Sequence, residues 1–266
     1  MHGKSDNPGK LYLIGAGPGD PELLTLKAAR VLRECDVVLY DRLVSVEVLS
    51  FARPESELIY VGKHEGEQES GQARIYDLIR EHALAGKTVA RLKGGDPLVF
   101  GRGAEEWDLA LDDGIQVELV PGVTSAISVP GLAGIPLTYR GVSQSFAVVT
   151  GHCLARQDPD HEKMKKRWRK YAAIDTLAVL MGVKNRILIA QALVAVGRRL
   201  DEPVAFVQRG SMPGEEVIES TLGEVADGKV EVTSPAVFVI GNVVRLRKRL
   251  SAPAEFPGQP VPAAAE

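Results

Sequence analysis

The sequence has little of what several classes of protein require. Its two cysteines, Cys35 and Cys153, stand far apart in no spacing typical of metal ligands, which argues against a disulfide scaffold and a structural zinc site. Aromatic residues make up only 5% of the chain and the formal net charge is −3, whereas nucleic-acid-binding proteins usually carry a strong basic excess. We therefore expect no metal centre and no nucleic-acid partner.

Long apolar runs are missing as well. None approaches the roughly 20 residues that a membrane-spanning helix needs. Residues 1–10 are polar, unlike a signal peptide. The scarcity of cysteine fits a reducing compartment. We expect a cytoplasmic protein that does not act at a membrane.

The remaining composition is typical of a globular chain. Its 266 residues are 45% hydrophobic and 25% charged, which supplies enough core for one large or two modest domains. Only the last segment, residues 251–266, is rich in proline and alanine. This segment is predicted to be a disordered tail.

Short apolar runs alternate with helical patterns through the first half of the chain. Strands are predicted at residues 11–14, 37–40, 58–61, 88–92 and 117–120. Between them, helices are predicted from a Thr25 cap to about residue 34, at 74–84 and at 105–111, and a further helix opens after residues 121–126. The alternation predicts an α/β domain with a parallel sheet and helices on both faces.

The second half has strands that lie closer together. A break at residues 134–138 sets a predicted domain boundary near residue 140. Beyond it, strands are predicted at 145–150, 176–181, 204–208, 216–222 and 235–240, with a helix at 187–196. Several of these strands could be antiparallel, so we expect a second α/β domain with a mixed sheet. The predicted domains are residues 10–140 and 141–250.

The most informative stretch is residues 91–103, directly after a predicted strand. Gly94 and Gly95 leave the strand exit without side chains, so the backbone can approach a ligand, and Asp96 adds one carboxylate there. Open α/β sheets bind ligands beyond the carboxyl ends of their strands. A ligand site is therefore one interpretation, and an ordinary tight turn fits the same residues.

The loop at residues 15–20 begins like a dinucleotide-binding fingerprint and then departs from it. Asp20 stands where the third glycine belongs, and Pro18 lacks a backbone N–H. A carboxylate beside a pyrophosphate would repel it, so the loop suits a ligand without phosphates, such as a nucleoside. A plain strand-to-helix turn is the alternative.

Two ionisable residues end predicted strands. Asp41 follows the strand at 37–40 and Lys63 follows the one at 58–61, so both would lie on one rim of the sheet. Acid–base chemistry is one reading; a helix cap and a solvated lysine are the alternatives. His152 is the best-placed histidine, although such residues more often bond a turn. The basic run at residues 163–170 is expected to be a solvated surface.

Together these stretches resemble the tetrapyrrole methyltransferase family, most closely its members that methylate uroporphyrinogen III. The resemblance covers about residues 10–248, and residues 91–103 are its most specific part. Other matching segments are residues 15–20, 40–44, 61–63, 121–126, 133–138, 150–152, 180–182 and 234–244.

This resemblance implies two α/β domains with the active site in the cleft between them, and a homodimer. It implies S-adenosylmethionine as methyl donor, S-adenosylhomocysteine as product, and uroporphyrinogen III as a small-molecule substrate that becomes precorrin-1 and then precorrin-2 on the way to sirohaem and cobalamin. It also implies Asp41 and Lys63 as the acid–base pair. The implied donor site is Pro18, Gly94, Gly95, Asp96, Val99, Thr124, Ser125, Met181, Gly210 and Ala236.

The substrate side is where the chain departs from the family pattern. His64, Gln68, Gly71 and Tyr139 stand at positions where the family usually has other residues. Eight substrate carboxylates require cations, for which Arg42, Lys63, Arg102 and Arg140 are candidates. A methyltransferase of a later corrin intermediate or another acceptor, and a nicotinamide-dependent oxidoreductase, are the alternative functions.

Overall fold

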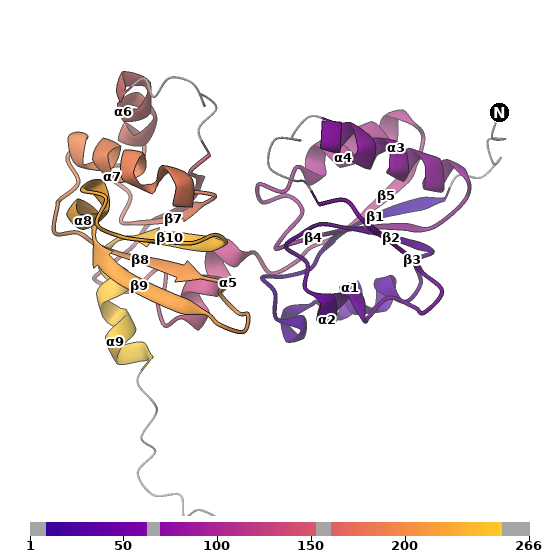
Figure 1. The fold of residues 1–266 in the computed structure, drawn as a ribbon, viewed down its shortest axis with the longest axis horizontal. Helices are drawn as coiled ribbons and strands as arrows, with labels where there is room; N and C mark the ends of the chain where they lie inside the picture. Colours follow the sequence, from indigo (N-terminus) through magenta and orange to yellow (C-terminus); the bar gives the residue numbers. More distant parts are fainter. Residues whose placement is uncertain (1–8, 63–69, 153–160, 252–266) are drawn as a thin grey trace, which may run out of the picture.

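The computed structural model describes residues 9–62, 70–152 and 161–251. Lys63, His64, Gln68 and Cys153 lie outside these residues, as do residues 252–266 of the predicted tail. The described chain forms two lobes, each built around a five-stranded sheet, and the chain passes from the first lobe to the second near helix α5, Ser125–Leu132 (Figure 1).

The first sheet is entirely parallel, as the alternating pattern predicted. Its order is β3-β2-β4-β1-β5, and its strands are β1 (Lys10–Gly15), β2 (Val37–Tyr40), β3 (Glu57–Tyr60), β4 (Val89–Lys93) and β5 (Gln116–Val120). The central strand β4 is buried along its whole length. All five carboxyl ends therefore point to one edge of the sheet.

Helices cover both faces of this sheet. Figure 1 shows α3 (Ser70–Leu84) and α4 (Gly103–Asp112) on one face, and α1 (Leu26–Leu32) and α2 (Val46–Leu49) on the other. A short 3-10 helix, η1 (Pro21–Leu23), precedes α1, and the Thr25 hydroxyl caps α1 by accepting a hydrogen bond from the Ala28 N–H at 3.2 Å. Each face has its own apolar core.

The second sheet is mixed, as expected. Its order is β6-β7-β10-β8-β9, where β6 and β7 are parallel and β10 runs antiparallel to both β7 and β8. The outer strand β9 is antiparallel to β8. The strands are β6 (Phe146–Thr150), β7 (Thr176–Leu180), β8 (Pro203–Gln208), β9 (Glu216–Thr221) and β10 (Ala236–Ile240).

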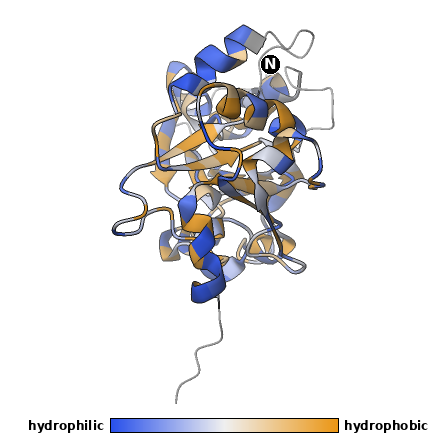
Figure 2. Cartoon of the chain, turned by 90° about the vertical axis from the view of Figure 1, so that its left-hand side faces the viewer, coloured by the Kyte–Doolittle hydropathy of each residue, from blue (hydrophilic) through white to orange (hydrophobic). Residues whose placement is uncertain are grey.

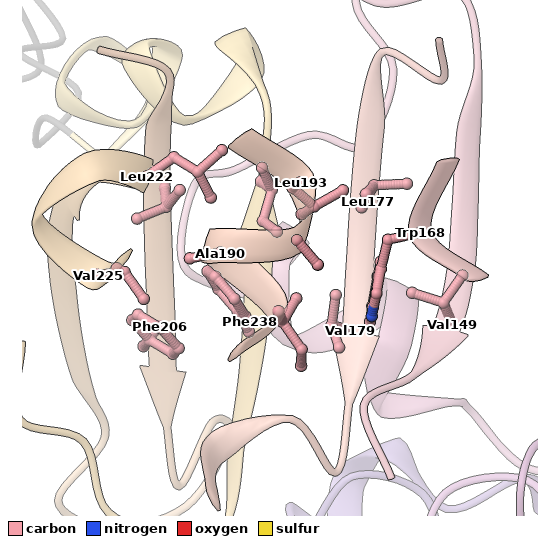
Figure 3. Close-up of a cluster of buried hydrophobic side chains, with 14 of the residues drawn as sticks. Val149, Trp168, Leu177, Val179, Ala190, Leu193, Phe206, Leu222, Val225 and Phe238 are labelled. Atoms are coloured by element: carbon pink, nitrogen blue, oxygen red, sulfur yellow. The ribbon is translucent and has the colours of Figure 1, made fainter. Parts of the chain in front are cut away.

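Three helices close one face of the second sheet: α6 (His161–Arg169), α7 (Arg186–Ala195) and α8 (Leu222–Ala226). Trp168 of α6 is fully buried there with Phe206 and Phe238, whose rings stack at 4.1 Å (Figure 3). Short helices η2 (Val183–Asn185), η3 (Asn242–Leu246) and α9 (Arg247–Leu250) complete the lobe. Figure 2 shows hydrophobic strands inside and hydrophilic residues on the outer helices.

Helix α5 packs against the second sheet. It contacts β7 and β10, and Val129, Ala133, Ile135 and Leu137 share a core with residues of that sheet such as Val239. The predicted boundary near residue 140 assigns these residues to the first domain, and it stays a prediction. The contacts show that the segment before this boundary packs with the second sheet.

Candidate active site

The exits of β1, β4 and β5 meet through their backbones. Gly17 and Gly95 form an antiparallel bridge, in which the Gly95 N–H donates to the Gly17 carbonyl at 2.6 Å and the Gly17 N–H returns a bond at 3.2 Å. Gly15 and Gly122 pack so closely that a Cβ on Gly15 would lie 2.5 Å from the Gly122 Cα. These two glycines are required because backbone meets backbone there.

Asp96 ties two of these exits together. Its Oδ1 accepts a hydrogen bond from the Leu98 N–H at 2.9 Å, and its Oδ2 accepts one from the Gly122 N–H at 3.1 Å. Thr124 caps α5 through its hydroxyl, and Ser125 is the first helical residue. Several predicted donor residues therefore lie in these adjacent loops or at the start of α5: Pro18, Gly94, Gly95, Asp96, Val99, Thr124 and Ser125. Their contact with a donor stays a prediction.

The remaining predicted donor residues share one edge of the second sheet. Met181 follows the last residue of β7, and Gly210 follows β8 by two residues. Ala236 opens β10, directly beside Gln208 at the end of β8. The sequence could not show this neighbourhood, because it depends on β10 lying between β7 and β8.

The two edges face each other across a direct contact. The Asp20 N–H donates to the Ser211 hydroxyl at 3.3 Å, which joins the loop after β1 to the loop after β8. A Cβ on Gly19 would meet Met212 at 2.5 Å, so these loops also touch through side chains. Gly210 packs in the same way against Val129 of α5. The donor residues predicted on the two lobes thus lie on facing edges.

Residues with strained backbone conformations lie at the same edges. Among the residues that the structure describes, five non-glycine residues have positive φ: Phe100 (55°), Arg102 (59°), Met181 (55°), Arg209 (48°) and Ser211 (66°). All five lie in segments that leave β4, β7 or β8. Such conformations cost about 1–3 kcal/mol each and cluster at ligand-binding and catalytic sites.

Asp41 lies just beyond β2, on the edge where the first sheet faces the second. Its Oδ1 accepts a hydrogen bond from the Leu43 N–H at 3.0 Å, and its Oδ2 lies 3.6 Å from Nη2 of Arg91. The side chain remains 26% exposed. A local turn and an ion pair thus fix the carboxylate. Its proposed partner Lys63 lies outside the described residues.

Arg91 belongs to a buried charged cluster that sequence reasoning did not assign. Arg91 and Lys93 on β4 both bond to Glu106 on α4, and the three are between 1% and 3% exposed. Burial, and secondarily the charge of Arg91, lowers the pKa of Lys93 to about 8, although Glu106 acts in the opposite direction. The sequence feature that could have predicted this cluster is the pair of cations two residues apart on a buried strand, because they point to the same face of the sheet.

The candidate substrate cations lie in different places. Arg42 follows Asp41 and is exposed, and Arg102 pairs with Glu105 at 3.2 Å at the start of α4. Arg140 lies in the turn closed by Tyr139 and Ser143, next to the first residue of β7. Strand β7 runs roughly 16 Å from this first residue to Met181, which follows its last residue. Within a single chain, Arg140 therefore lies at the opposite edge of the second sheet from Met181. Its role in binding the substrate stays a prediction.

The basic run at residues 163–170 forms most of α6 and the turn after it. Lys166, Arg169 and Lys170 are exposed, whereas Arg167 donates to the carbonyls of Thr150 at 2.6 Å and of His152 at 2.9 Å. His152 itself bonds the local turn, since its N–H donates to the Thr150 hydroxyl at 3.2 Å. Within the described part of the chain, no helix is long and apolar enough to cross a membrane.

The chain belongs to the family Tetrapyrrole (Corrin/Porphyrin) Methylases, whose sequence model matches residues 10–226. It is 42% identical to the uroporphyrinogen-III C-methyltransferase of Priestia megaterium over 89% of this chain and 98% of that one.

Two further proteins are similar to this chain over most of its length. A crystal structure of uroporphyrin-III C-methyl transferase from Thermus thermophilus, complexed with S-adenyl homocysteine, is 49% identical and superimposes with a TM-score of 0.77 over 90% of this chain and 100% of that one. Siroheme synthase 2 of Aeromonas hydrophila is 43% identical over 91% of this chain, which spans 51% of that longer protein.

Proposed function

We propose that this protein transfers methyl groups from S-adenosylmethionine to carbons of uroporphyrinogen III, giving precorrin-1 and then precorrin-2. The observation that carries the proposal is the 42% identity to a uroporphyrinogen-III C-methyltransferase over 98% of that enzyme.

The residues at the facing edges fit a donor of this kind. An adenosyl group with an amino-acid tail requires backbone groups, hydroxyls and apolar contact rather than a phosphate cradle. The loops provide these through Gly95, through the hydroxyls of Thr124 and Ser125, and through Met181, whose side chain is 51% exposed. When bound, the donor supplies an electrophilic methyl group to an electron-rich pyrrole carbon, which makes positioning the main requirement.

Asp41 is our candidate for the proton acceptor. Its carboxylate is held at the rim by the Leu43 N–H and by Arg91, and it remains partly exposed. In the step proposed for it, a C–H bond of the methylated macrocycle breaks, the electron pair stays in the ring system, and the proton goes to an Asp41 oxygen. Lys63 is the proposed partner, and Arg42 and Arg102 the proposed ligands of substrate carboxylates.

We further propose a cytoplasmic homodimer. Large apolar side chains on described residues support self-association: Leu26 and Val46, near the starts of α1 and α2, are 92% and 78% exposed. Light scattering coupled to size exclusion measures the assembly, and a mass of one chain at micromolar concentration rejects the dimer.

The test of function is single-turnover methylation of uroporphyrinogen III at saturating S-adenosylmethionine, with products separated by mass. The wild type should add one and then a second methyl group. Asp41→Asn is nearly isosteric but cannot accept the proton, so the rate should fall by roughly 10² to 10⁴. Absence of methylation in the wild type, with donor binding intact, rejects uroporphyrinogen III as substrate.

A binding measurement separates this proposal from the oxidoreductase alternative. Calorimetric titrations with S-adenosylhomocysteine and with NAD, made on one protein preparation, measure the affinity for each ligand. Binding of S-adenosylhomocysteine and no binding of NAD supports the methyltransferase. The opposite result rejects it. Asp41→Asn should bind S-adenosylhomocysteine like the wild type, which makes it the matched control for loss of rate.

A further inference from the structure

Strand β4 carries two cations on the face of the sheet that is otherwise apolar. Alternation along Val89–Lys93 points Val89, Arg91 and Lys93 to the side of α3 and α4, and Ala90 and Leu92 to the opposite side. The core on the α3 and α4 side consists of residues such as Leu39 and Ile75. Two charges in such a place require partners, because an unpaired buried charge is strongly destabilising.

Glu106 is the anion that lies deepest in this cluster. Its carboxylate, 0% exposed, accepts two hydrogen bonds from Nζ of Lys93, at 2.9 and 3.0 Å. It also accepts one from Nε2 of Gln72 on α3 at 3.2 Å. Both helices that cover this face therefore contribute to the cluster, and Glu106 is fixed from several directions.

Every nitrogen of Arg91 has a partner in a different direction. Its Nε lies 3.4 Å from Oε1 of Glu106, and its Nη1 donates to the carbonyls of Leu39 at 3.3 Å and Leu92 at 3.0 Å. The remaining Nη2 lies 3.6 Å from Oδ2 of Asp41. The guanidinium is planar and rigid, so the contacts at Nε and Nη1 determine where Nη2 points.

The charges of the cluster balance only when Asp41 is counted. Arg91 and Lys93 carry two positive charges, and Glu106 supplies one negative charge in the interior. The second negative charge is Asp41, at the exposed end of the same chain of contacts. Asp41 therefore completes the charge balance of the cluster at the place where Nη2 of Arg91 points.

We propose that Arg91 is a positioning residue, anchored by buried Glu106, that holds the Asp41 carboxylate in the orientation needed for proton acceptance at the rim. Arg91 lies beneath Asp41 and acts through it, without touching the substrate. The inference rests on the proposed function, because it gives Asp41 the role of base. It extends that proposal from the rim into the core of the first lobe.

The test compares two variants that change the buried charge by the same amount. Arg91→Met and Lys93→Met each remove one cation and leave Glu106 paired with the other. Of these two cations, Arg91 lies 3.6 Å from Asp41, whereas Lys93 bonds to both oxygens of Glu106. In single-turnover methylation at saturating donor, Arg91→Met should slow the reaction by roughly 10- to 100-fold, and Lys93→Met should stay within about threefold of the wild type. Equal losses in the two variants would mean that the cluster is merely structural.

A double variant distinguishes positioning from an independent effect. In an Asp41→Asn background, Arg91→Met should cause little further loss, because the residue on which it acts is already disabled. A further loss as large as in the wild-type background overturns the proposal. If instead Asp41→Asn methylates at the wild-type rate, Asp41 is not the base. The positioning role of Arg91 is then rejected because its target residue is wrong, whatever the Arg91 variants show.

Folding is checked separately from rate. Thermal unfolding and calorimetry with S-adenosylhomocysteine should show folded variants with unchanged donor affinity. Should Arg91→Met not fold, Arg91→Lys replaces it, since the ammonium keeps the charge but cannot make the same set of contacts. Arg91→Lys should lower kcat by about 3- to 10-fold with KM unchanged. Wild-type kcat in that variant also overturns the proposal.

Discussion

The carboxylate of Asp96 accepts a hydrogen bond from the Gly122 N–H at 3.1 Å and thereby ties the exit of β4 to the exit of β5. Its other oxygen accepts from the Leu98 N–H. The family resemblance implies that Asp96 contacts the donor, and this contact stays a prediction. In the structure, the two hydrogen bonds of Asp96 hold together the loops among which the donor residues are predicted to lie.

The predicted donor contact and these two hydrogen bonds give the first prediction. Asp96→Ala should weaken S-adenosylhomocysteine binding by about 1–3 kcal/mol, because a hydrogen-bonded carboxylate is lost. Asp96→Asn should also weaken binding, since its amide has only one oxygen for the two backbone N–H donors. Calorimetry measures both. Wild-type affinity in both variants removes Asp96 from the donor site.

The second prediction concerns the closely packed glycines. Gly15→Ala would place a Cβ 2.5 Å from the Gly122 Cα, so the loops must separate. We expect a loss of about 1–3 kcal/mol in the free energy of unfolding, as for other overpacked sites. Gly131→Ala in α5 is the control, because its Cβ meets nothing within 4 Å and alanine favours a helix. Chemical denaturation should separate the two; equal stability would contradict the close packing.

The third prediction follows from the lowered pKa of Lys93. Between pH of about 8 and its ordinary value of 10.5, the unfolded chain holds this proton and the folded chain does not. The unfolded state then binds more protons, so Lys93 contributes a rise in stability as the pH increases through that window. Below a pH of about 8 the charged side chain is buried, and its desolvation cost is fully present.

Urea denaturation of wild type and Lys93→Met at pH 8 and pH 10.5 tests this. The stability difference, wild type minus variant, should rise by up to about 3 kcal/mol. A difference that does not change between the two pH values would mean that burial does not lower the pKa of Lys93.

The fourth prediction concerns helix α6. Reversing the exposed charges of Lys166, Arg169 and Lys170 to glutamate should leave kcat nearly unchanged and alter mainly the dependence on salt. Arg167→Met is the contrast, because it loses the bonds to the Thr150 and His152 carbonyls and should cost about 1–3 kcal/mol of stability. A collapse of kcat in the triple variant at fixed ionic strength would assign these residues to substrate binding.

Much of the fold followed from local patterns. The strand at residues 37–40 has the predicted bounds, and Thr25 caps α1 as predicted. Helix α8 was not predicted, because Leu222 continues an apolar strand pattern and only the Thr221 and Glu224 capping box ends it. The predicted helix at 74–84 begins earlier, at Ser70.

Four features could be predicted from the sequence: the alternation of strands and helices, the parallel first sheet, the mixed second sheet and the glycine-rich strand exits. These depend on periodicity and on backbone freedom, which are local. Three features became visible in the three-dimensional structure: α5 packs with the second sheet, Arg140 lies away from Met181, and Arg91 connects Glu106 to Asp41. Each of these depends on strand order or on contacts between distant residues, and nothing in the local sequence specifies which charged residues will be neighbours.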